Sequence, residues 1–368
     1  MELFPAENEA FLTRQLITYI GNKRSLLPFI GQALERVKKR LGKDKLKIFD
    51  AFSGSGAAAR FFKRHAEALF VNDLEAYSEA VNRCYLANAD ELPLAELREI
   101  HRCLLRRLGE PLRKGFITEL YAPEDENNIK EGERVFYTPR NAMFIDTARQ
   151  YLEDIDPGLR QFFIGPLLSE SSVHANTAGV FKGFYKDVQT GKGRYGGAGG
   201  NALSRIMGDI ELPFPVWSNF SCPVEIFRDD TNALVPGLEE TDLAYLDPPY
   251  NQHPYGSNYF MLNLILSYER PAGLSRVSGI PPDWKRSAYN SRQHAIRAIS
   301  NLVENLRSKY LLVSFNSDGF ISFTDMQSLL EKIGKVEIFE TPYNTYRGSR
   351  NLRDREVHVR EYLYLVEK

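Results

Sequence analysis

The sequence predicts an α/β protein with a mostly parallel, twisted sheet, into which a largely helical and loop-rich block is inserted. Two observations support this fold class. Residues 46–73 read as a strand, a glycine-rich turn, a helix and a second strand, which is the order of a βαβ unit and therefore of parallel strands. This pattern stops near residue 91 and resumes at residue 224, so both ends of the chain are expected to build one sheet.

Each expected element rests on its own apolar pattern. Apolar residues recur at helical spacing over residues 26–37 and 97–108, which predicts amphipathic helices there. Between them come a strand at 46–49, a helix at 57–64 and a strand at 68–71. After the insertion, strand-like runs lie at 224–227, 243–246, 310–315, 335–339 and 362–366, with a helix at 293–309.

These patterns divide the chain into three segments. Residues 1–90 and 223–368 are expected to form the two halves of the α/β domain, and residues 91–222 the insertion. The insertion contains the stretch GKGRYGGAGG at 191–200, whose glycines favour an irregular, loop-like backbone.

Composition narrows the class of protein without naming a function. Of the 368 residues, 47 are Lys or Arg and 48 are Asp or Glu, so the net charge of −1 does not indicate a basic nucleic-acid coat. A local basic groove is still enough to contact phosphates. Cys84, Cys103 and Cys222 lie far apart, and no cluster has zinc-binding spacing, so we expect neither disulfides nor a metal. With no signal-peptide pattern and no apolar run long enough to span a bilayer, we expect a soluble, cytoplasmic protein without a membrane partner.

The first motif that carries chemistry is the segment FDAFSGSG at residues 49–56. Glycines at such a turn let the backbone approach a bound nucleotide, and open α/β sheets bind nucleotides at the carboxyl ends of their strands. Asp73 ends the next strand, roughly 20 residues further on, where a dinucleotide fold places its ribose-binding acid. A structural turn without a ligand is the alternative interpretation.

The second motif is more specific. An apolar strand at 243–246 runs directly into Asp247, Pro248, Pro249 and Tyr250. The two prolines fix an extended corner, at which the Asp247 carboxylate and the Pro248 carbonyl both accept hydrogen bonds. The exocyclic amine of adenine offers two N–H donors that match these acceptors, and Tyr250 offers a flat face for stacking a base. The alternative is a proline-stiffened surface turn with an incidental aspartate.

At these residues the chain resembles the D12 class of adenine-N6-specific DNA methyltransferases, which includes the Dam methylases. The resemblance implies a Rossmann-like methyltransferase domain with a target-recognition insertion. It also implies that Tyr19 and Lys23 line the methionine end of S-adenosylmethionine. The further cofactor-binding positions that it implies are Asp50, Phe52, Gly54, Gly56, Asp73 and Asp247. Where the family often has two glycines before its lysine, this chain has Gly21-Asn22, and its middle block differs from that of the short Dam enzymes.

Other candidate residues follow from position alone. Asp229 and Asp230 come directly after the 224–227 strand and are candidates for holding the cofactor's adenine amine. Basic residues interleaved with aromatic ones suit phosphate contacts. The DNA-binding candidates are Lys182, Lys186, Lys192 and Arg194 in the middle block, and Tyr346 and Arg347 near the C-terminus. A solvated loop or strand end is the alternative in each case.

The sequence therefore predicts a site-specific DNA adenine-N6 methyltransferase. It would transfer a methyl group from S-adenosylmethionine to a flipped-out adenine in double-stranded DNA, without a metal, as a modification methylase that a cognate restriction enzyme accompanies. The nearest alternative is adenine-N6 methylation of ribosomal RNA. Cytosine-N4 and protein-glutamine methyltransferases more often have Ser or Asn at position 247. A nicotinamide-dependent dehydrogenase leaves the Asp-Pro-Pro-Tyr motif unexplained, and a DNA-binding module without activity leaves Asp247 without a role.

Overall fold

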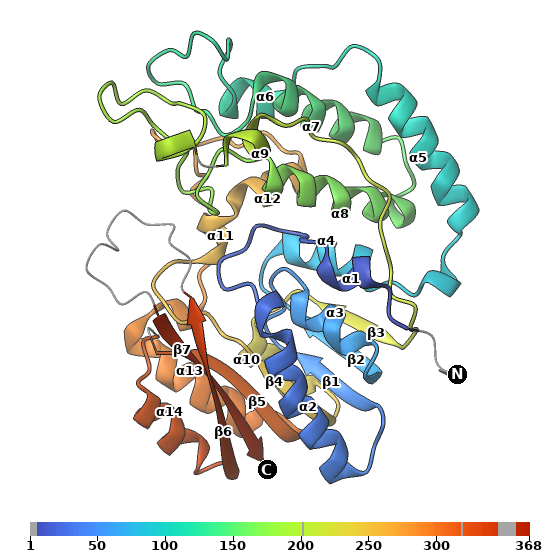
Figure 1. The fold of residues 1–368 in the computed structure, drawn as a ribbon, viewed down its shortest axis with the longest axis vertical. Coiled ribbons are helices and arrows are strands. Elements are labelled where there is room, and N and C mark those ends of the chain that lie inside the picture. Colours follow the sequence, from blue (N-terminus) through green and yellow to red (C-terminus); the bar gives the residue numbers. More distant parts are fainter. Residues whose placement is uncertain (1–5, 201, 318, 345–357) are drawn as a thin grey trace.

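The computed structural model describes residues 6–200, 202–317, 319–344 and 358–368, and its centre is a seven-stranded sheet in the order β3-β2-β1-β4-β5-β7-β6 (Figure 1). The strands are β1 (Leu46–Asp50), β2 (Ala66–Asn72), β3 (Val224–Phe227), β4 (Thr241–Leu246), β5 (Ser308–Asn316), β6 (Lys335–Asn344) and β7 (His358–Glu367). β1 to β5 pair in parallel. β7 runs antiparallel to both of its neighbours, β5 and β6.

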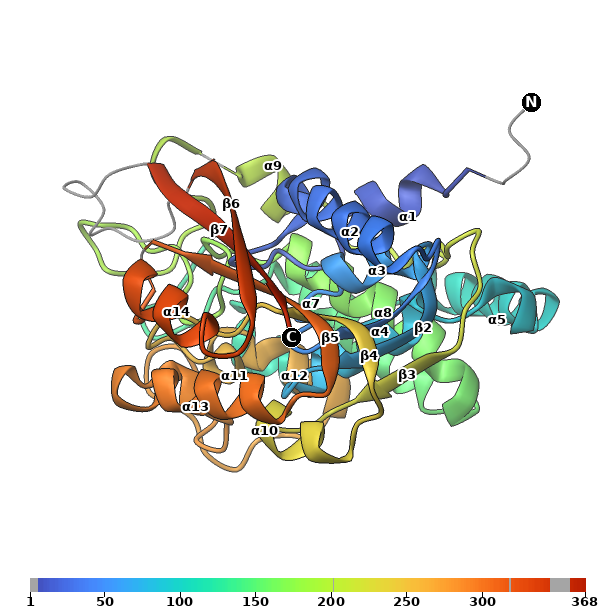
Figure 2. The ribbon, with the colours of Figure 1, turned by 90° about the horizontal axis from the view of Figure 1, so that it is seen from below.

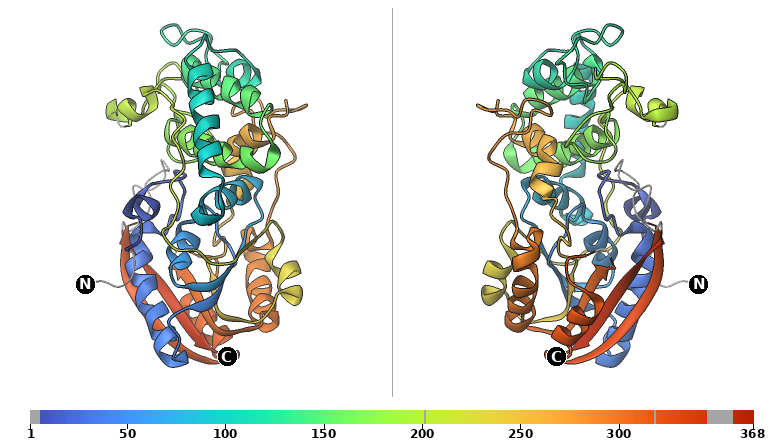
Figure 3. Two further views of the ribbon diagram at one scale, coloured as in Figure 1. Left: turned by 90° about the vertical axis from the view of Figure 1, so that its right-hand side faces the viewer. Right: turned by 90° about the vertical axis from the view of Figure 1, so that its left-hand side faces the viewer.

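Helices cover both faces of this sheet, with α2 and α3 on one side and α10 and α13 on the other (Figures 2 and 3). The longer helices are α2 (Leu27–Leu41), α3 (Ala57–Lys63), α4 (Ala76–Tyr85), α5 (Leu94–Leu108), α6 (Phe116–Tyr121), α7 (Pro139–Leu152), α8 (Pro157–Val173), α12 (Phe260–Ser267), α13 (Arg292–Asn305) and α14 (Phe323–Leu330). Shorter ones are α1 (Glu9–Thr13), α9 (Leu203–Met207), α10 (Thr231–Leu234), α11 (Tyr255–Asn258), η1 (Arg24–Leu26), η2 (Ala89–Glu91), η3 (Ala198–Gly200), η4 (Val235–Gly237) and η5 (Ala288–Asn290).

Alternation along the strands explains why there are two hydrophobic cores. Successive side chains of a strand point to opposite faces of the sheet. In β4, Leu243 and Tyr245 join the core that includes α2, α3 and the helical block, whereas Ala244 and Leu246 join the core beneath α13 and α14. All six residues of β4 are buried, which is typical of a parallel strand covered on both sides.

The strand order fixes where a ligand can bind. From β1 the chain proceeds to β2 and β3 on one side, while β4 and β5 lie on the other. The carboxyl ends of β1 and β4 therefore flank the point at which the strand order reverses, where open α/β sheets form their binding crevice. Asp50 ends β1 and Asp247 follows β4 directly.

The middle segment forms a helical layer beyond one edge of the sheet domain, containing α5 to α9 (Figure 1). It is anchored through α8, which packs on α4 and α12. The contact between α4 and α8 is close because position 165 is a glycine: a Cβ there would lie 2.6 Å from Cys84 Cβ and 2.7 Å from Cys84 Sγ. The boundaries that the sequence analysis places after residues 90 and 222, between the middle segment and the two halves of the α/β domain, stay a prediction.

All seven predicted strands are present, and most are longer than predicted. The helix predicted over 293–309 is wrong at its end, because α13 stops at Asn305 and β5 begins at Ser308. Leu306 has an extended backbone, and the Ser308 hydroxyl hydrogen-bonds the Thr241 hydroxyl at 2.9 Å. Pairing with β4 thus ends the helical pattern early. Among the described residues, no helix is long and apolar enough to cross a membrane.

We predict that Gly165→Ala destabilises the protein. Inserting a methyl group into a packed contact costs about 1–3 kcal/mol, and the higher helix propensity of alanine returns up to about 1 kcal/mol. Urea unfolding should therefore show a net loss on the order of 1 kcal/mol, and at most about 3 kcal/mol. Gly237→Ala is the control, because a Cβ at position 237 meets nothing within 4 Å; equal stability of the two variants would contradict the close packing of α4 on α8.

Candidate active site

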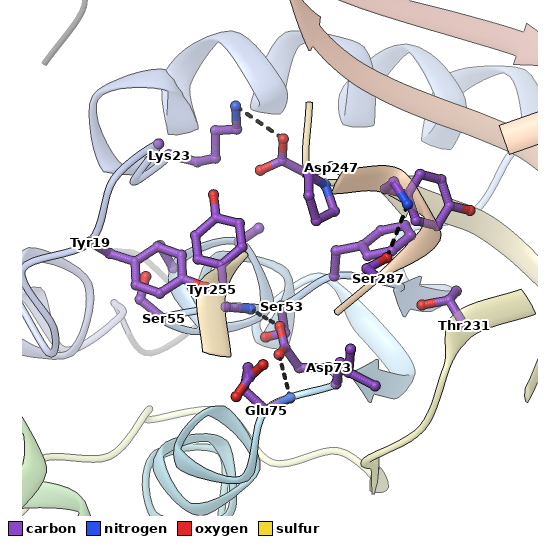
Figure 4. Close-up of a pocket in the computed structure, with 18 of the residues that line it drawn as sticks. Tyr19, Lys23, Ser53, Ser55, Asp73, Glu75, Thr231, Asp247, Tyr255 and Ser287 are labelled. Atoms are coloured by element: carbon purple, nitrogen blue, oxygen red, sulfur yellow. Dashed lines mark hydrogen bonds and ion pairs between the residues drawn. The ribbon is translucent and has the colours of Figure 1, made fainter. Parts of the chain in front are cut away.

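A pocket opens at the carboxyl ends of β1, β2, β3 and β4 (Figure 4). It encloses an empty volume of about 860 Å³, including its open mouth. Residues from both ends of the chain line it: Tyr19, Gly21, Asn22, Lys23, Phe52, Ser53, Gly54, Ser55, Ala57, Ala58, Asp73, Leu74, Glu75, Asp229, Asp230, Thr231, Tyr245, Asp247, Pro249, Tyr255, Lys285, Ser287, Tyr289 and Asn290. Most of the predicted cofactor residues are thus brought together around one cavity.

The glycine turn after β1 forms the floor of this pocket. Gly54 has a positive φ of 53°, and a Cβ there would lie 2.8 Å from Tyr19 Cε1, so only glycine allows the aromatic ring to rest on the turn. The Gly54 N–H donates to Asp73 Oδ2 at 2.7 Å, and its carbonyl accepts from the Ser78 hydroxyl at 2.6 Å. These bonds fix the turn in place.

Two of the predicted cofactor residues do not line the pocket. A Cβ on Gly56 would lie 2.5 Å from Asn82 Oδ1, so this glycine is needed for packing behind the turn. Asp50 is fully buried. Burial raises the pKa of its carboxyl well above the usual range, and the charge of Asp247 raises it further. The Phe52 N–H and the Ser53 hydroxyl lower that pKa, although neither reaches hydrogen-bond geometry.

Asp73 and Glu75 place two carboxylates on the pocket wall after β2. Asp73 Oδ1 accepts from the Glu75 N–H at 2.9 Å, so the two residues form one tight turn. Burial raises the pKa of Asp73, with backbone hydrogen bonds opposing the shift. Burial also raises the pKa of Glu75 to about 7, against the hydrogen bond that Asn263 donates. Together these groups offer acceptors for paired hydroxyls.

Lys23 and Asp247 meet across the pocket (Figure 4). Lys23 Nζ lies 3.1 Å from Asp247 Oδ1. The same Nζ lies 2.6 Å from Oε1 of Glu361, on β7. Lys23 is only 7% exposed and Glu361 only 1%, so a lysine from the N-terminal part of the chain is buried between two carboxylates from its C-terminal part.

The charges of this group set its protonation. Burial raises the pKa of Asp247 to about 6; Lys23 lowers that pKa and Glu361 raises it. For Lys23, burial lowers the pKa, but the attraction of Asp247 and Glu361 outweighs burial and leaves the pKa well above its usual value. Lys23 therefore stays charged, while Asp247 is a carboxylate that titrates just below neutral pH.

Three tyrosines stack beside the cavity. The ring centroid of Tyr19 lies 5.0 Å from that of Tyr255 and 4.7 Å from that of Tyr259, and the ring planes are nearly parallel. The Tyr259 hydroxyl accepts from the Ile20 N–H at 2.7 Å. This packing ties the N-terminal segment to α11, and it gives the pocket an aromatic wall that suits a cation.

The Asp-Pro-Pro-Tyr corner follows β4 as the sequence predicts. Pro248 is buried and Pro249 lines the pocket. The Tyr250 ring packs edge-on against Phe315, with centroids 6.3 Å apart, and its carbonyl accepts from the Phe320 N–H at 3.0 Å. Tyr250 is thus held beside the pocket rather than in its lining, and it remains a proposed stacking face.

Asp229 and Asp230 both line the pocket, but they are engaged differently. Asp230 is the N-cap of α10, where its side chain accepts from the Asn232 and Ala233 N–H groups. Asp229 is exposed, and within the described part of the chain its carboxylate is engaged at Oδ1 alone, by the Asp230 N–H at 2.8 Å. Asp229 is therefore the better placed of the two to bind a ligand.

The proposed DNA-binding residues do not form one cluster. Lys182 lines a second cleft next to the corner, with Gln252 and Arg286. The others lie on a short hairpin closed by a bridge between Lys186 and Gly193: Lys186 sits over the Phe184 ring, Lys192 is exposed and Arg194 donates to the Gly197 carbonyl. Tyr346 and Arg347 lie outside the described residues.

Several pocket residues were not anticipated from the sequence. Glu75, Thr231, Ser287 and Asn290 line the pocket, and Glu361 lies behind Lys23. Glu75 could have been suspected from the sequence, because it is acidic and follows Asp73 by two positions. Nothing in the sequence of residues 285–290 indicates that they line the pocket. Within the described residues, no group of three or more His, Cys, Asp or Glu side chains is arranged to hold a metal ion.

An α/β sheet with a nucleotide-type pocket at its switch point and Asp-Pro-Pro-Tyr on its rim defines a methyltransferase of the amino-group type. The family model for D12 class N6 adenine-specific DNA methyltransferases matches residues 19–187 and 216–317. The chain belongs to this family. Glu361 lies outside the matched residues.

Similar proteins carry the names of methyltransferases, and two of them match this chain along nearly their full length. The Type II methyltransferase M.NlaIII of Neisseria lactamica is 28% identical over 96% of this chain and 99% of its own. M.CviAII of Paramecium bursaria Chlorella virus 1 is 27% identical over 95% and 98%. The Type II methyltransferase M.FokI of Planomicrobium okeanokoites is 25% identical over 95% of this chain but only 52% of its own.

We predict that Asp247→Asn stabilises the protein above pH 6. Because the pKa of Asp247 is raised from 3.8 to about 6 in the folded state, ionising it costs stability as pH rises between these values, and the cost persists above pH 6. One pKa unit is about 1.4 kcal/mol, so urea unfolding at pH 8 should favour the variant by up to ~3 kcal/mol, and the difference should vanish below pH 4.

Asp242→Asn is the matched control for that experiment. Asp242 is also buried, but hydrogen bonds from Lys43 and Lys309 outweigh burial and lower its pKa. Its ionised form therefore stabilises the fold at neutral pH, and this contribution is lost as the pH falls through the lowered pKa. Asp242→Asn should lose stability at pH 8. If both variants lose stability there, the description of Asp247 as a destabilised carboxylate is wrong.

Proposed function

We propose that this protein is a site-specific methyltransferase that transfers the methyl group of S-adenosylmethionine to N6 of adenine in double-stranded DNA. The observation that carries the proposal is the Asp247 carboxylate at the end of β4, 3.1 Å from a buried lysine and on the rim of the pocket. Membership of an adenine-specific DNA family supports DNA as the substrate.

The pocket residues fit S-adenosylmethionine. Asp73 and Glu75 would accept from its ribose hydroxyls, and Asp229 from its adenine amine. The bare backbone of Gly54 would let the cofactor approach the floor, and Tyr19 with Tyr255 would face the positively charged sulfonium. When bound, the cofactor supplies an electrophilic methyl group. Asp50 and Gly56 would act indirectly, by shaping the turn that Phe52 and Gly54 belong to.

The chain's own residues would prepare the acceptor. Adenine inside a duplex is out of reach, so the base must be flipped out, at an unstacking cost of a few kcal/mol. Tyr250 would stack on the flipped base. Asp247 and the Pro248 carbonyl would accept from the two N6–H groups and aim the nitrogen at the methyl group. Such positioning supplies much of the rate enhancement, and at neutral pH Asp247 is ionised and able to accept.

DNA would lie across the mouth of the pocket. Lys182 stands next to the Asp-Pro-Pro-Tyr corner, and Lys186, Lys192 and Arg194 lie on the hairpin that the Lys186–Gly193 bridge closes. These cations would contact phosphates, which position a duplex without reading its sequence. Tyr346 and Arg347 are proposed to join them. Since several relatives are named Type II methyltransferases or modification methylases, we further propose that a restriction enzyme accompanies this protein in the cytoplasm.

Labelled methyl transfer tests this function directly. The protein is incubated with labelled S-adenosylmethionine and, in parallel, with unmethylated duplex DNA and with total RNA, and the products are digested to nucleosides. We expect N6-methyldeoxyadenosine from the DNA, and no product from Asp247→Asn, which keeps the volume of the side chain but removes its charge. Label confined to RNA would move the assignment to a ribosomal RNA methyltransferase, and label in neither would refute the proposal.

We predict that Asp229→Ala weakens S-adenosylmethionine binding roughly tenfold, because a hydrogen bond to a charged acceptor contributes about 1.5 kcal/mol or more. Asp230→Asn should bind with nearly the parental affinity, since asparagine caps a helix as well as aspartate does. Isothermal titration calorimetry compares the two. A larger loss for Asp230→Asn would show that the adenine amine is held by the other aspartate.

A further inference from the structure

Glu361 is a buried acid that contacts Lys23, the partner of Asp247, but does not itself line the pocket. It lies on β7, opposite Asn316 in the register with β5, and is 1% exposed. Its Oε1 accepts from Lys23 Nζ at 2.6 Å and from the Ser314 hydroxyl at 2.9 Å. Because Glu361 is buried and does not line the pocket, it is not placed to contact a ligand there directly.

The position of Lys23 depends on this contact. Lys23 is the N-cap of η1 and makes no capping bond with its side chain, so its long side chain is located by the two carboxylates at its end. The bond to Glu361 is the shorter of the two, 2.6 Å against 3.1 Å to Asp247. Lys23 contacts Oδ1 of Asp247, which leaves Oδ2 as the oxygen to face the substrate.

The charge of Lys23 is shared between both acids. A buried cation that faced Asp247 alone would hold that carboxylate strongly ionised and make it a weak base, since an opposite charge within a few ångströms favours the charged form. Glu361 takes up part of this charge and adds its own negative potential. Both the weakened influence of Lys23 and the negative potential of Glu361 raise the pKa of Asp247, which makes its carboxylate a better proton acceptor.

We propose that Glu361 is a positioning residue for methyl transfer: it fixes Lys23 beside Asp247 and offsets the lysine's charge, so that Asp247 Oδ2 can take the proton that leaves N6. This inference rests on the proposed function. In the step, the bond between the methyl carbon and sulfur breaks as the carbon–N6 bond forms. One N6–H bond then breaks, its electron pair stays on nitrogen, and the proton passes to Asp247 and on to solvent.

Other titratable groups also face Asp247. Lys23 and Glu361 act on it directly, and Asp50, Tyr245, Tyr250 and Tyr255 each feel its charge. The pKa of every one of these tyrosines is raised, so they stay neutral below pH 9. Asp50 is present in parent and variant alike, so a difference between their pH profiles reports on Glu361.

The test compares Glu361→Gln with Glu361→Asp by single-turnover methylation of duplex DNA from pH 5 to 9. The parent's rate should fall as the pH drops through about 6, the pKa of Asp247. Glu361→Gln should move this acid limb to lower pH, because a negative charge that raises the pKa of Asp247 is gone, and should lower the plateau rate at least tenfold. Glu361→Asp keeps the negative charge but moves it away from Lys23, because the side chain is one methylene shorter. The acid limb of its pH–rate profile should therefore stay near that of the parent, while its plateau rate falls.

Glu340→Gln is the matched control, since Glu340 lies on the adjacent strand β6 and forms an exposed ion pair with Arg360. It should leave rate and pH profile unchanged. Calorimetric binding of S-adenosylmethionine provides a readout apart from turnover, and all three variants should bind within about twofold of the parent if Glu361 acts on Asp247 rather than on the pocket.

Two outcomes would overturn the inference while the parent remains active. One is an unmoved acid limb in Glu361→Gln, which would indicate a purely structural role. The other is a parental plateau rate in both substituted forms. If Glu361→Gln does not fold, Glu361→Asp decides alone, and a parental rate in it refutes the proposal. An inactive parent would instead refute the proposed function.

Discussion

Burying one lysine between two carboxylates is the constraint on which the site depends. Moving an ion out of water costs several kcal/mol, and removing Lys23 would leave two buried carboxylates without their cation, a loss that typically costs about 3–5 kcal/mol. Lys23, Asp247 and Glu361 are far apart in sequence, so the interaction exists only when both ends of the chain have been brought to the same edge of the sheet. The Asp-Pro-Pro-Tyr corner and the fold therefore depend on each other.

The sheet topology supplies that edge. β1 and β4 end side by side at the switch point, and β5 with the antiparallel β7 closes the far side, where Glu361 is held. The helical middle segment leaves this arrangement intact. The chain departs from the sheet domain after α4 and returns to it at β3. The segment is anchored through α8, which packs on α4. The described residues of the middle segment are absent from the pocket lining, so the helical layer is accommodated without disturbing the pocket.

The parts of the molecule that local patterns determine were predictable. Buried parallel strands are short apolar runs, so β1 to β5 were predicted from the sequence. The two prolines after Asp247 predicted a rigid corner. The resemblance then supplied Tyr19 and Lys23. Glu361 was not found, because it stands just before the strand predicted at 362–366 and its role is set by pairing with a residue more than 300 positions away. The end of α13 was missed for a related reason: Leu306 continues a helical pattern, and only pairing with β4 stops it.

The central claim, that Asp247 receives the amino group of a flipped adenine, is tested most directly by a crystal structure with duplex DNA containing the recognition site and an unreactive analogue of S-adenosylmethionine. The account predicts an extrahelical adenine whose N6 lies ~2.7–3.2 Å from Asp247 Oδ2 and from the Pro248 carbonyl, a normal hydrogen-bond distance, with Lys23 still between Asp247 and Glu361. An adenine that remains stacked in the duplex, or one whose N6 faces other residues, would contradict it.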